Sequence, residues 1–448
     1  MANSPFLLRM TLSALMATTI PLHTEEASAG QILYLMKGGN INRSLDLYME
    51  YAKDKGQHDL DLLRELGLYI LDNGASSNKT EIQMLTLFGA GISVHEKTLY
   101  ILESGIQRQE PELQIIALNM LARYQNDDAD HALLTAMRSN FVMIRLEAAF
   151  HLCQKKHPQA IAHVEALMQK VPPETHPIFP PLFSLVGNEQ AIRNLKRLMN
   201  NSDSNVRVAA VMSAASHQRD DLLPMIRTLA TQHDIAQQEA TAFALGQLRD
   251  ESSIKKLQQL TQSKTKHVRL AAHFSLYLLG EKSSLNYLVA QAKERDPYAI
   301  TLLGKIPGQE DVLAELLSIP DLTIRTNVAL ALLERKDSRC LKAIAEVLVR
   351  DPRDLAYVKQ SSLGKSLHAW RVIPSAEENI KENPYLRELS LGMREETLVK
   401  ALELPEKDFL ALAQLMFELH QNELVPSLVR LLENVASRSA INLLKFYS

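Results

Sequence analysis

The sequence has few of the residues that characterise disulfide-rich, fibrous or turn-rich proteins. Its 448 residues include 2 cysteines, 16 glycines and 18 prolines, and aromatic residues make up only 5%. So few cysteines exclude a disulfide framework, and so few glycines and prolines exclude many tight hairpins or long flexible linkers. Because hydrophobic residues still reach 46%, we expect a core of aliphatic side chains, which suits close helix packing better than a β-sandwich.

The two cysteines, Cys153 and Cys340, each lie within a helical pattern. A disulfide between them would join parts of the chain that are far apart in an extended stack of helices, so we expect two buried free thiols.

The chain also lacks an excess of charge of one sign and lacks long hydrophobic runs. It has 49 basic and 52 acidic residues and a formal net charge of −3. This balance gives no overall field that would attract nucleic acid or an anionic membrane. No apolar run beyond the N-terminal region has the length needed to span a bilayer, so we expect no transmembrane segment.

Residues 1–29 have the features of an export signal. Arg9 precedes an apolar stretch from Met10 to Leu22, and the sequence Ala27-Ser28-Ala29 has the small-residue form preferred before cleavage. Three threonines and a proline interrupt the apolar stretch, so an irregular arm or a first helix is the alternative. We expect an exported protein, periplasmic or secreted, if this segment is removed, and a cytoplasmic protein otherwise.

A repeat of 31 residues organises the rest of the chain. Gln238 and Arg269 begin the same pattern 31 positions apart: a small residue three positions later and an apolar residue seven positions later. The series of first positions, here called anchors, is Gln83, Gln114, Arg145, His176, Arg207, Gln238 and Arg269. The residues seven positions after them are all apolar: Ala90, Leu121, Leu152, Phe183, Ala214, Leu245 and Leu276. A fixed period of this length predicts an all-α fold, a right-handed α–α superhelix (α-solenoid) of stacked helical pairs.

The pattern predicts five segments. Residues 1–29 are the possible signal peptide or N-terminal arm, residues 30–79 an N-terminal helical cap, and residues 80–350 the repeat array. Residues 351–394 are an irregular insertion, expected to hold short helices and loops, and residues 395–448 are a C-terminal helical cap.

Two repeats are irregular. The unit of His176 contains five prolines within residues 172–181, so its first helix is expected to be shortened, kinked or partly extended. After Arg269 the pattern resumes at Arg325, which comes 56 positions later, whereas two full repeats would span 62. The unit between them has therefore lost about six residues.

The segments 203–215 (DSNVRVAAVMSAA), 238–260 and 266–280 (KHVRLAAHFSLYLLG) resemble the short HEAT-like repeats named after phycobiliprotein lyases. The resemblance covers residues 80–335 and implies the solenoid fold. Proteins with such repeats include scaffolds and adaptors, chromophore lyases and an iron-dependent hydroxylase of deoxyhypusine. In this family the anchor arginine is structural and pairs with an acidic group or with carbonyls of the adjacent turn. Here only Arg145, Arg207, Arg269 and Arg325 keep it.

The sequence lacks the residues that either enzyme of this family, a metal hydroxylase or a chromophore lyase, would need. A metal hydroxylase of this family needs several His-Glu pairs, and the chain has one, His95-Glu96. One such pair is too few for a site that usually needs three or more protein ligands. A chromophore lyase would need a hydrophobic cleft, which no motif marks. We therefore predict no catalytic residues, no metal site and no cofactor.

A nucleic-acid interface is a weaker alternative. Basic and aromatic residues that would form it are Arg193, Lys196, Arg197, Lys255, Lys256, Lys264, Lys266, His267, Tyr277 and Tyr287. Lysines near helix ends more often only solvate a surface, so the case is not strong.

The leading hypothesis is a non-enzymatic scaffold or adaptor that binds a protein or an extended peptide. Rigid stacked repeats offer a long preformed surface, which lowers the ordering cost of binding. We expect the contacts on the second helices of residues 192–260 and on the 351–394 insertion. The alternative is a HEAT-type enzyme, a chromophore lyase or a metal-dependent hydroxylase.

Overall fold

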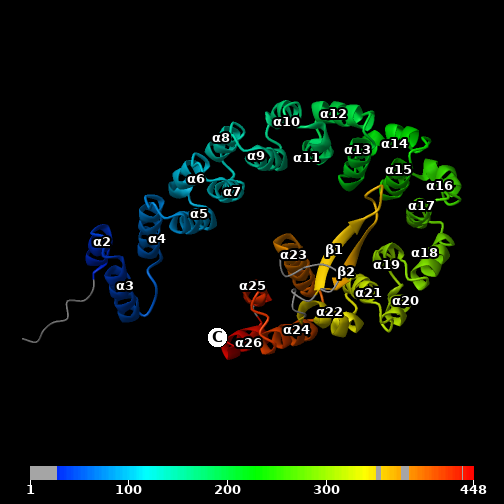
Figure 1. Cartoon of the computed structure of the whole chain (residues 1–448). Coiled ribbons are helices and arrows are strands. Elements are labelled where there is room, and N and C mark those ends of the chain that lie inside the picture. The colour runs from blue at the N-terminus through cyan, green and yellow to red at the C-terminus, as the bar shows by residue number, and fades with distance from the viewer. Residues whose placement is uncertain (1–27, 350–354, 375–382, 436, 448) are drawn as a thin grey trace, which may run out of the picture. The chain divides into compact units, whose positions relative to one another are not determined.

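The computed structural model describes residues 28–349, 355–374, 383–435 and 437–447. These residues pack as two compact units that divide between Leu167 and Met168. Figure 1 shows their helices and strands. Apart from Ser28 and Ala29, which begin the first helix, the predicted signal segment lies outside the described residues. None of the helices described has the length and apolar character needed to cross a membrane.

Unit 1 consists of helices. They are α2 (Ala29–Lys37), α3 (Ile41–Lys55), α4 (Leu60–Ala75), α5 (Thr80–Ser93), η1 (Glu96–Thr98), α6 (Leu99–Ile106), α7 (Pro111–Leu121), α8 (Asp127–Ala136), α9 (Val142–Gln154) and α10 (Ala160–Met168). The first helices of the repeats, α5, α7 and α9, stack on one another in sequence.

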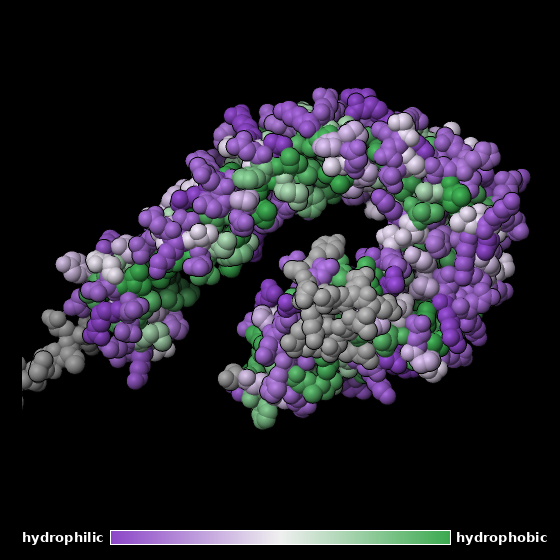
Figure 2. Space-filling model, viewed as in Figure 1, coloured by the Kyte–Doolittle hydropathy of each residue, from purple (hydrophilic) through white to green (hydrophobic). Residues whose placement is uncertain are grey.

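Unit 2 continues the helical pairs. Its repeat helices are η2 (Pro173–Ile178), α11 (Phe179–Val186), α12 (Glu189–Met199), α13 (Ser204–Ser216), η3 (Asp220–Leu222), α14 (Leu223–Leu229), α15 (Ile235–Gln247), η4 (Glu251–Ser253), α16 (Ile254–Leu260), α17 (Lys266–Leu278), α18 (Ser284–Lys293), α19 (Pro297–Gly304), α20 (Glu310–Leu316), α21 (Leu322–Glu334), η5 (Ser338–Cys340) and α22 (Leu341–Val349). The prediction of an all-α solenoid of helical pairs is confirmed. Figure 2 shows mostly hydrophilic residues along the row formed by the second helices α12, α14, α16 and α18.

The repeat period reflects close packing of successive first helices. The small residues three positions after the anchors, such as Ala210 and Ala272, are fully buried. Gly246 of α15 lies against Ser275 of α17, and a Cβ on this glycine would lie only 2.6 Å from the Ser275 Cα. A larger side chain there would separate the two helices, which accounts for the glycine that follows Leu245.

Both irregular units have short first helices, as the prolines and the missing residues predict. In the proline-rich unit the 3₁₀-helix η2 contains Pro173 and Pro177, and α11, which has Pro180 and Pro181 in its first turn, has only 8 residues. In the later unit α19 also has 8 residues, whereas α17 and α21 have 13 each.

The insertion contains a β-hairpin, so the expectation of short helices and loops is wrong for residues 355–374, whereas residues 384–394 are helical. Strands β1 (Leu355–Ser361) and β2 (His368–Pro374) pair antiparallel, with Leu355 opposite Pro374 and Ser361 opposite His368. The runs LAYVKQS and HAWRVIP are rich in aromatic and β-branched residues on either side of a turn that contains glycine, which favours strands. Residues 351–354 and 375–382 of the predicted insertion lie outside the described residues.

Both edges of the hairpin are hydrogen-bonded by helix side chains. Asn327 of α21 accepts the N–H of Trp370 at 2.8 Å and donates to the Trp370 carbonyl at 2.6 Å. Thr323 of the same helix accepts a further N–H of β2 at 3.1 Å. On the other edge, Ser390 accepts the N–H of Tyr357 at 3.0 Å. Because an isolated two-stranded sheet is marginal in water, these contacts account for its stability here.

The tip of the hairpin is fixed by a buried glutamate. Glu239 of α15 has no exposed surface, and its Oε1 accepts the hydroxyls of Ser362 and, at 2.6 Å, of Ser366. Its Oε2 accepts the N–H of Gly364 at 3.2 Å. A Cβ on Gly364 would lie 2.6 Å from the carbonyl oxygen of Ala236, so only glycine lets the tip approach α15 this closely. We call these contacts the Glu239 clasp.

The helix after the hairpin completes the other side of this region. Helix α23 (Pro384–Ala401) packs on β1 and is followed by α24 (Glu406–Glu418), α25 (Val425–Val435) and α26 (Arg438–Tyr447). Arg394 of α23 is 1% exposed and donates from Nε to the Leu348 carbonyl at 3.2 Å. A guanidinium therefore satisfies a carbonyl at the C-terminal end of α22, and α23 is fixed in position.

Replacing Glu239 with alanine should release the hairpin tip. The change leaves three buried donors without their acceptor, and we expect a loss of roughly 3 kcal/mol in the free energy that holds the hairpin in place. The chain has one tryptophan, Trp370, on β2, so urea titration followed by its fluorescence reports on the hairpin, while circular dichroism reports on the helices. The fluorescence transition should move to lower urea in Glu239→Ala and stay in place in the exposed control Glu251→Ala. Equal transitions in both variants would contradict this assignment.

Candidate functional site

Unit 2 contains a cavity of about 570 Å³ between its first helices, the hairpin and α23. Its side chains come from α13, α15, α19, α21, both strands and α23, and from the residue that follows α19, so segments far apart in sequence meet here. The lining residues that the following argument uses are Phe243, Tyr298, Lys305, Glu334, Lys359, His368, Trp370, Glu396, Val399, Lys400 and Glu403. A volume of this size lies within the range usual for ligand sites.

One wall of the cavity is basic and aromatic. Lys305 follows the last residue of α19, Lys359 lies on β1 and Trp370 faces Lys359 across the two strands. The Lys359 ammonium lies 6.0 Å from the centre of the Trp370 ring. Among the described residues, neither lysine forms an ion pair, so both positive charges face the cavity or solvent without a neutralising group.

The part of the lining on and after α21 and α23, here called the acidic wall, carries acidic residues that are largely neutralised. Lys400 of α23 lies 3.2 Å from Glu334 and 3.0 Å from Glu403, and Lys336 lies 3.2 Å from Glu403. The hydrogen bond from Lys400, together with that from Lys336, lowers the pKa of the Glu403 carboxyl. Of the three acidic residues Glu334, Glu396 and Glu403, only Glu396 forms no ion pair with another described residue.

His368 and Ser361 are the residues at the cavity that most resemble a catalytic pair. Its Nδ1 lies 2.9 Å from the Ser361 hydroxyl at the end of the hairpin ladder. Desolvation by the surrounding wall and the charges of Lys359 and Lys305 lower the pKa of His368, against an opposing effect of Glu239. A base needs an orienting partner and a pKa near the working pH. No carboxylate is hydrogen-bonded to this ring among the described residues, so the pair lacks the third member of a hydrolytic triad.

The sequence did not indicate this site. Lys359, His368 and Trp370 fall within the predicted insertion, whose role as a contact surface stays a prediction, and no pattern placed them beside Lys305 and Lys400. The second helices of residues 192–260 do not line the cavity, and their role as contact surfaces stays a prediction. The one available signal was the sole tryptophan within an irregular segment.

The anchors have a shared structural role. Each of six anchors donates a side-chain N–H to the backbone carbonyl six residues earlier, in the loop before its helix. These donors and acceptors are Gln83 to Ser77, Gln114 to Arg108, Arg145 to Ser139, Arg207 to Asn201, Gln238 to Gln232 and Arg269 to Ser263. Glutamine therefore replaces arginine without loss of the bond, which explains the departures from the family pattern.

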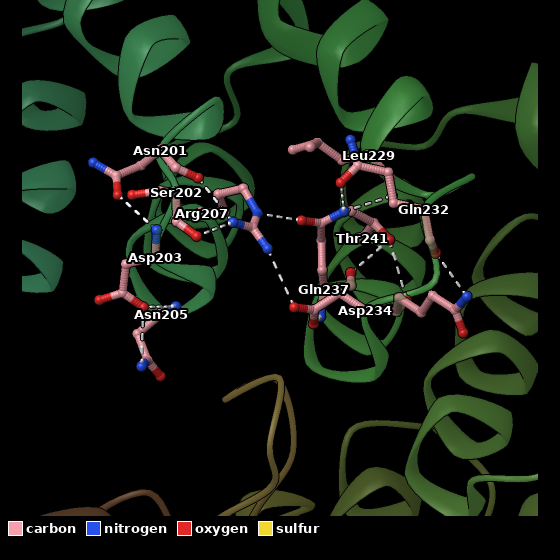
Figure 3. Close-up of polar contacts among 11 residues, drawn as sticks. Asn201, Ser202, Asp203, Asn205, Arg207, Leu229, Gln232, Asp234, Gln237 and Thr241 are labelled. Carbon is pink, nitrogen blue, oxygen red and sulfur yellow. Dashed lines mark hydrogen bonds and ion pairs between the residues drawn. The ribbon is translucent and has the colours of Figure 1, made fainter.

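Arg207 shows the fullest version of this contact (Figure 3). Its Nη1 donates to the Asn201 carbonyl at 2.8 Å, its Nε donates to the Gln237 side chain at 2.6 Å, and its Nη2 lies 3.2 Å from Asp234. Arg325 instead pairs with Glu346 at 2.6 Å. The prediction that these arginines are structural is confirmed by these bonds.

The residues proposed for a nucleic-acid interface are divided among other contacts. Lys266 pairs with the buried Asp296 at 2.8 Å, the ring of Tyr287 stacks on His273 and its hydroxyl accepts from Arg269, and Lys282 lies over the ring of Tyr277. The tyrosines are thus engaged within the protein, and the geometry adds no support to a base-stacking surface.

The remaining candidates do not meet in a chemical site. His95 accepts the N–H of Lys97 at the start of η1, and no group of three or more His, Cys, Asp or Glu suited to a metal occurs within the described ranges. Cys153 and Cys340 are free and fully buried, as predicted, in different units. Burial raises the pKa of each thiol to about 12, so neither is a ready nucleophile.

No family model and no curated protein matches the chain. Among solved structures, the CpcE–CpcF complex of phycocyanin lyase from Nostoc sp. PCC7120 is 19% identical over 48% of this chain and 92% of that chain, with a TM-score of 0.36. Yeast importin-β (Kap95p) is 11% identical over 99% of this chain and 69% of that chain, with a TM-score of 0.42. The paired and stacked helices define the chain as an α-solenoid of helical pairs.

The shared role of the anchors predicts an unequal pair of substitutions. Arg207→Gln keeps a donor for the Asn201 carbonyl, as Gln83 and Gln238 do, and should cost about 1 kcal/mol in the free energy of unfolding. Arg207→Leu leaves the carbonyl and Asp234 without this partner and should cost about 3 kcal/mol. Urea denaturation followed by circular dichroism measures both values. Equal losses would show that the bond to the preceding loop is not what the anchor provides.

The electrostatics of the basic wall predict a titration change. Replacing Lys359 with glutamine removes a positive charge that disfavours protonation of His368, so the pKa of His368 should rise. The control Lys255→Gln, on α16 outside the cavity, should leave that pKa unchanged. Proton–carbon NMR titration of the His368 ring measures both, and an unchanged pKa in Lys359→Gln would place the lysine too far from His368 to matter.

Proposed function

We propose that this chain is a non-enzymatic scaffold that binds an extended peptide segment of a partner protein in the cavity of unit 2. The observation that carries the proposal is the cavity itself, in which seven elements of unit 2, five helices and two strands, line one volume of about 570 Å³. The lining combines apolar surface with basic and acidic groups, which suits a polypeptide with mixed side chains.

The way the cavity is built favours binding without large rearrangement. The hairpin is held at its tip by Glu239 and at its edges by Asn327 and Ser390. Since these contacts order the walls before a ligand arrives, the entropic cost of binding falls mainly on the peptide. Trp370, Tyr298 and Phe243 supply the aromatic surface that most often contributes binding energy at protein interfaces.

Exposed apolar side chains on the first helices of unit 1 also support the scaffold proposal. Its first helices expose large apolar side chains, of which Leu85 is 71% exposed, Ile92 67% and Met143 66%. Apolar side chains exposed together often belong to protein–protein contacts.

An enzymatic alternative has less support. The chemistry nearest the cavity is the Ser361–His368 pair, and the lowered pKa of that histidine makes it a weaker base. The HEAT-type lyase and hydroxylase alternatives would need a chromophore-binding or metal-binding set of residues, and the described residues near the cavity offer neither.

Peptide selection tests the proposal. Peptides selected from a random phage-displayed library against the full chain should bind in calorimetry, and Val399→Trp should weaken them at least tenfold by filling the cavity mouth. Leu419→Trp is the matched control, because Val399 is 53% and Leu419 47% exposed and only Val399 lines the cavity. The proposal fails if no peptide is selected, or if the two variants affect binding equally.

A further inference from the structure

The cavity of unit 2 has an uneven distribution of charge that specifies its ligand further. On the wall formed by α19 and the hairpin, Lys305 and Lys359 are both exposed side chains without an ion pair among the described residues. His368 lies on the same wall and adds a third group that can become positive.

The acidic wall does not offset this charge. Glu334 and Glu403 share Lys400, and Glu403 also pairs with Lys336. With Glu396, the wall therefore has three carboxylates against two ammonium groups, a net charge of about −1, while the basic wall has about +2. The charge of the basic wall is therefore less neutralised than the charge of the acidic wall.

A second observation supports a positive potential at the basic wall. The pKa of His368 is lowered by desolvation and then by Lys359 and Lys305, so the two lysines act on the same point within the cavity. An anion placed between them would relieve this repulsion, whereas a cation would increase it.

The aromatic surface lies directly beside the positive charges. Trp370 is the cross-strand partner of Lys359, and Tyr298 of α19 lines the same cavity a few residues before Lys305. A ligand that presents a carboxylate next to an apolar side chain would satisfy both features at once.

We propose, building on the peptide-binding function above, that the cavity recognises an acidic segment, with a ligand carboxylate held between Lys305 and Lys359 and the adjacent apolar side chain against Trp370. The carboxylates of Glu334, Glu396 and Glu403, which line the same cavity, disfavour a polyanion that fills the whole cavity, such as a nucleic-acid strand. An acidic and apolar polypeptide is therefore the class of partner that the cavity fits.

A series of matched peptides tests this specificity with the full chain. Three acetylated and amidated hexapeptides alternate leucine with glutamate, glutamine or lysine, and a six-nucleotide thymidine oligomer serves as the nucleic-acid probe. Calorimetry measures the affinities, and Trp370 fluorescence reports whether the ligand reaches the cavity. The glutamate peptide should bind at least tenfold more tightly than the glutamine peptide, and raised salt should reduce this preference.

Two lysine variants and one control locate the preference. Lys305→Gln and Lys359→Gln should each reduce the affinity for the glutamate peptide about tenfold and leave the glutamine peptide unchanged. Lys255→Gln, on α16 outside the cavity, should change neither. Glutamate and glutamine peptides that bind equally well, with both still weakened by Val399→Trp, would overturn the acidic specificity and leave the peptide-binding function standing. Failure of all three peptides to bind would overturn both, and preferential binding of the thymidine oligomer would replace the peptide with a nucleic acid.

Discussion

The Glu239 clasp is the contact on which the architecture of unit 2 depends. A carboxyl group with no exposed surface accepts three hydrogen bonds from a turn that lies 123 to 127 residues further along the chain. Burying such a group is unfavourable unless donors surround it, and here the hairpin tip provides them. The clasp thus holds strands that would be marginal alone against the first helices, and the cavity exists because they are held there.

The repeat array could be predicted from the sequence because its determinants are local. Small residues at the positions of Ala210 and Ala272 and the glycine at 246 set the distance between neighbouring first helices, and they recur at a fixed period. The hairpin and the cavity could not be predicted in this way. Their determinants are single contacts between distant residues, such as Asn327 with Trp370 and Glu239 with Gly364, and nothing periodic marks such pairs.

The anchors show how one structural role admits different residues. The bond to the carbonyl six residues earlier needs only a side-chain N–H of the right reach, which arginine and glutamine both supply. Arginine adds contacts to the next unit, as Arg207 does with Asp234 and Gln237. The arginines therefore belong to the framework of the solenoid. Of the lysines that line the cavity, Lys305 and Lys359 are those without an ion pair among the described residues.

Hydrogen–deuterium exchange of residues 355–374 in the unliganded full chain tests the central claim most directly, because the claim is that helix side chains order this hairpin before any ligand binds. The amides of Tyr357, Gly364, Trp370 and Val372 donate to Ser390, Glu239, Asn327 and Thr323 respectively. The account predicts that these four amides are strongly protected, although none of them would have a partner in a free hairpin. Exchange at the rate of an unstructured peptide would show that the clasp does not form and that the cavity is not preformed.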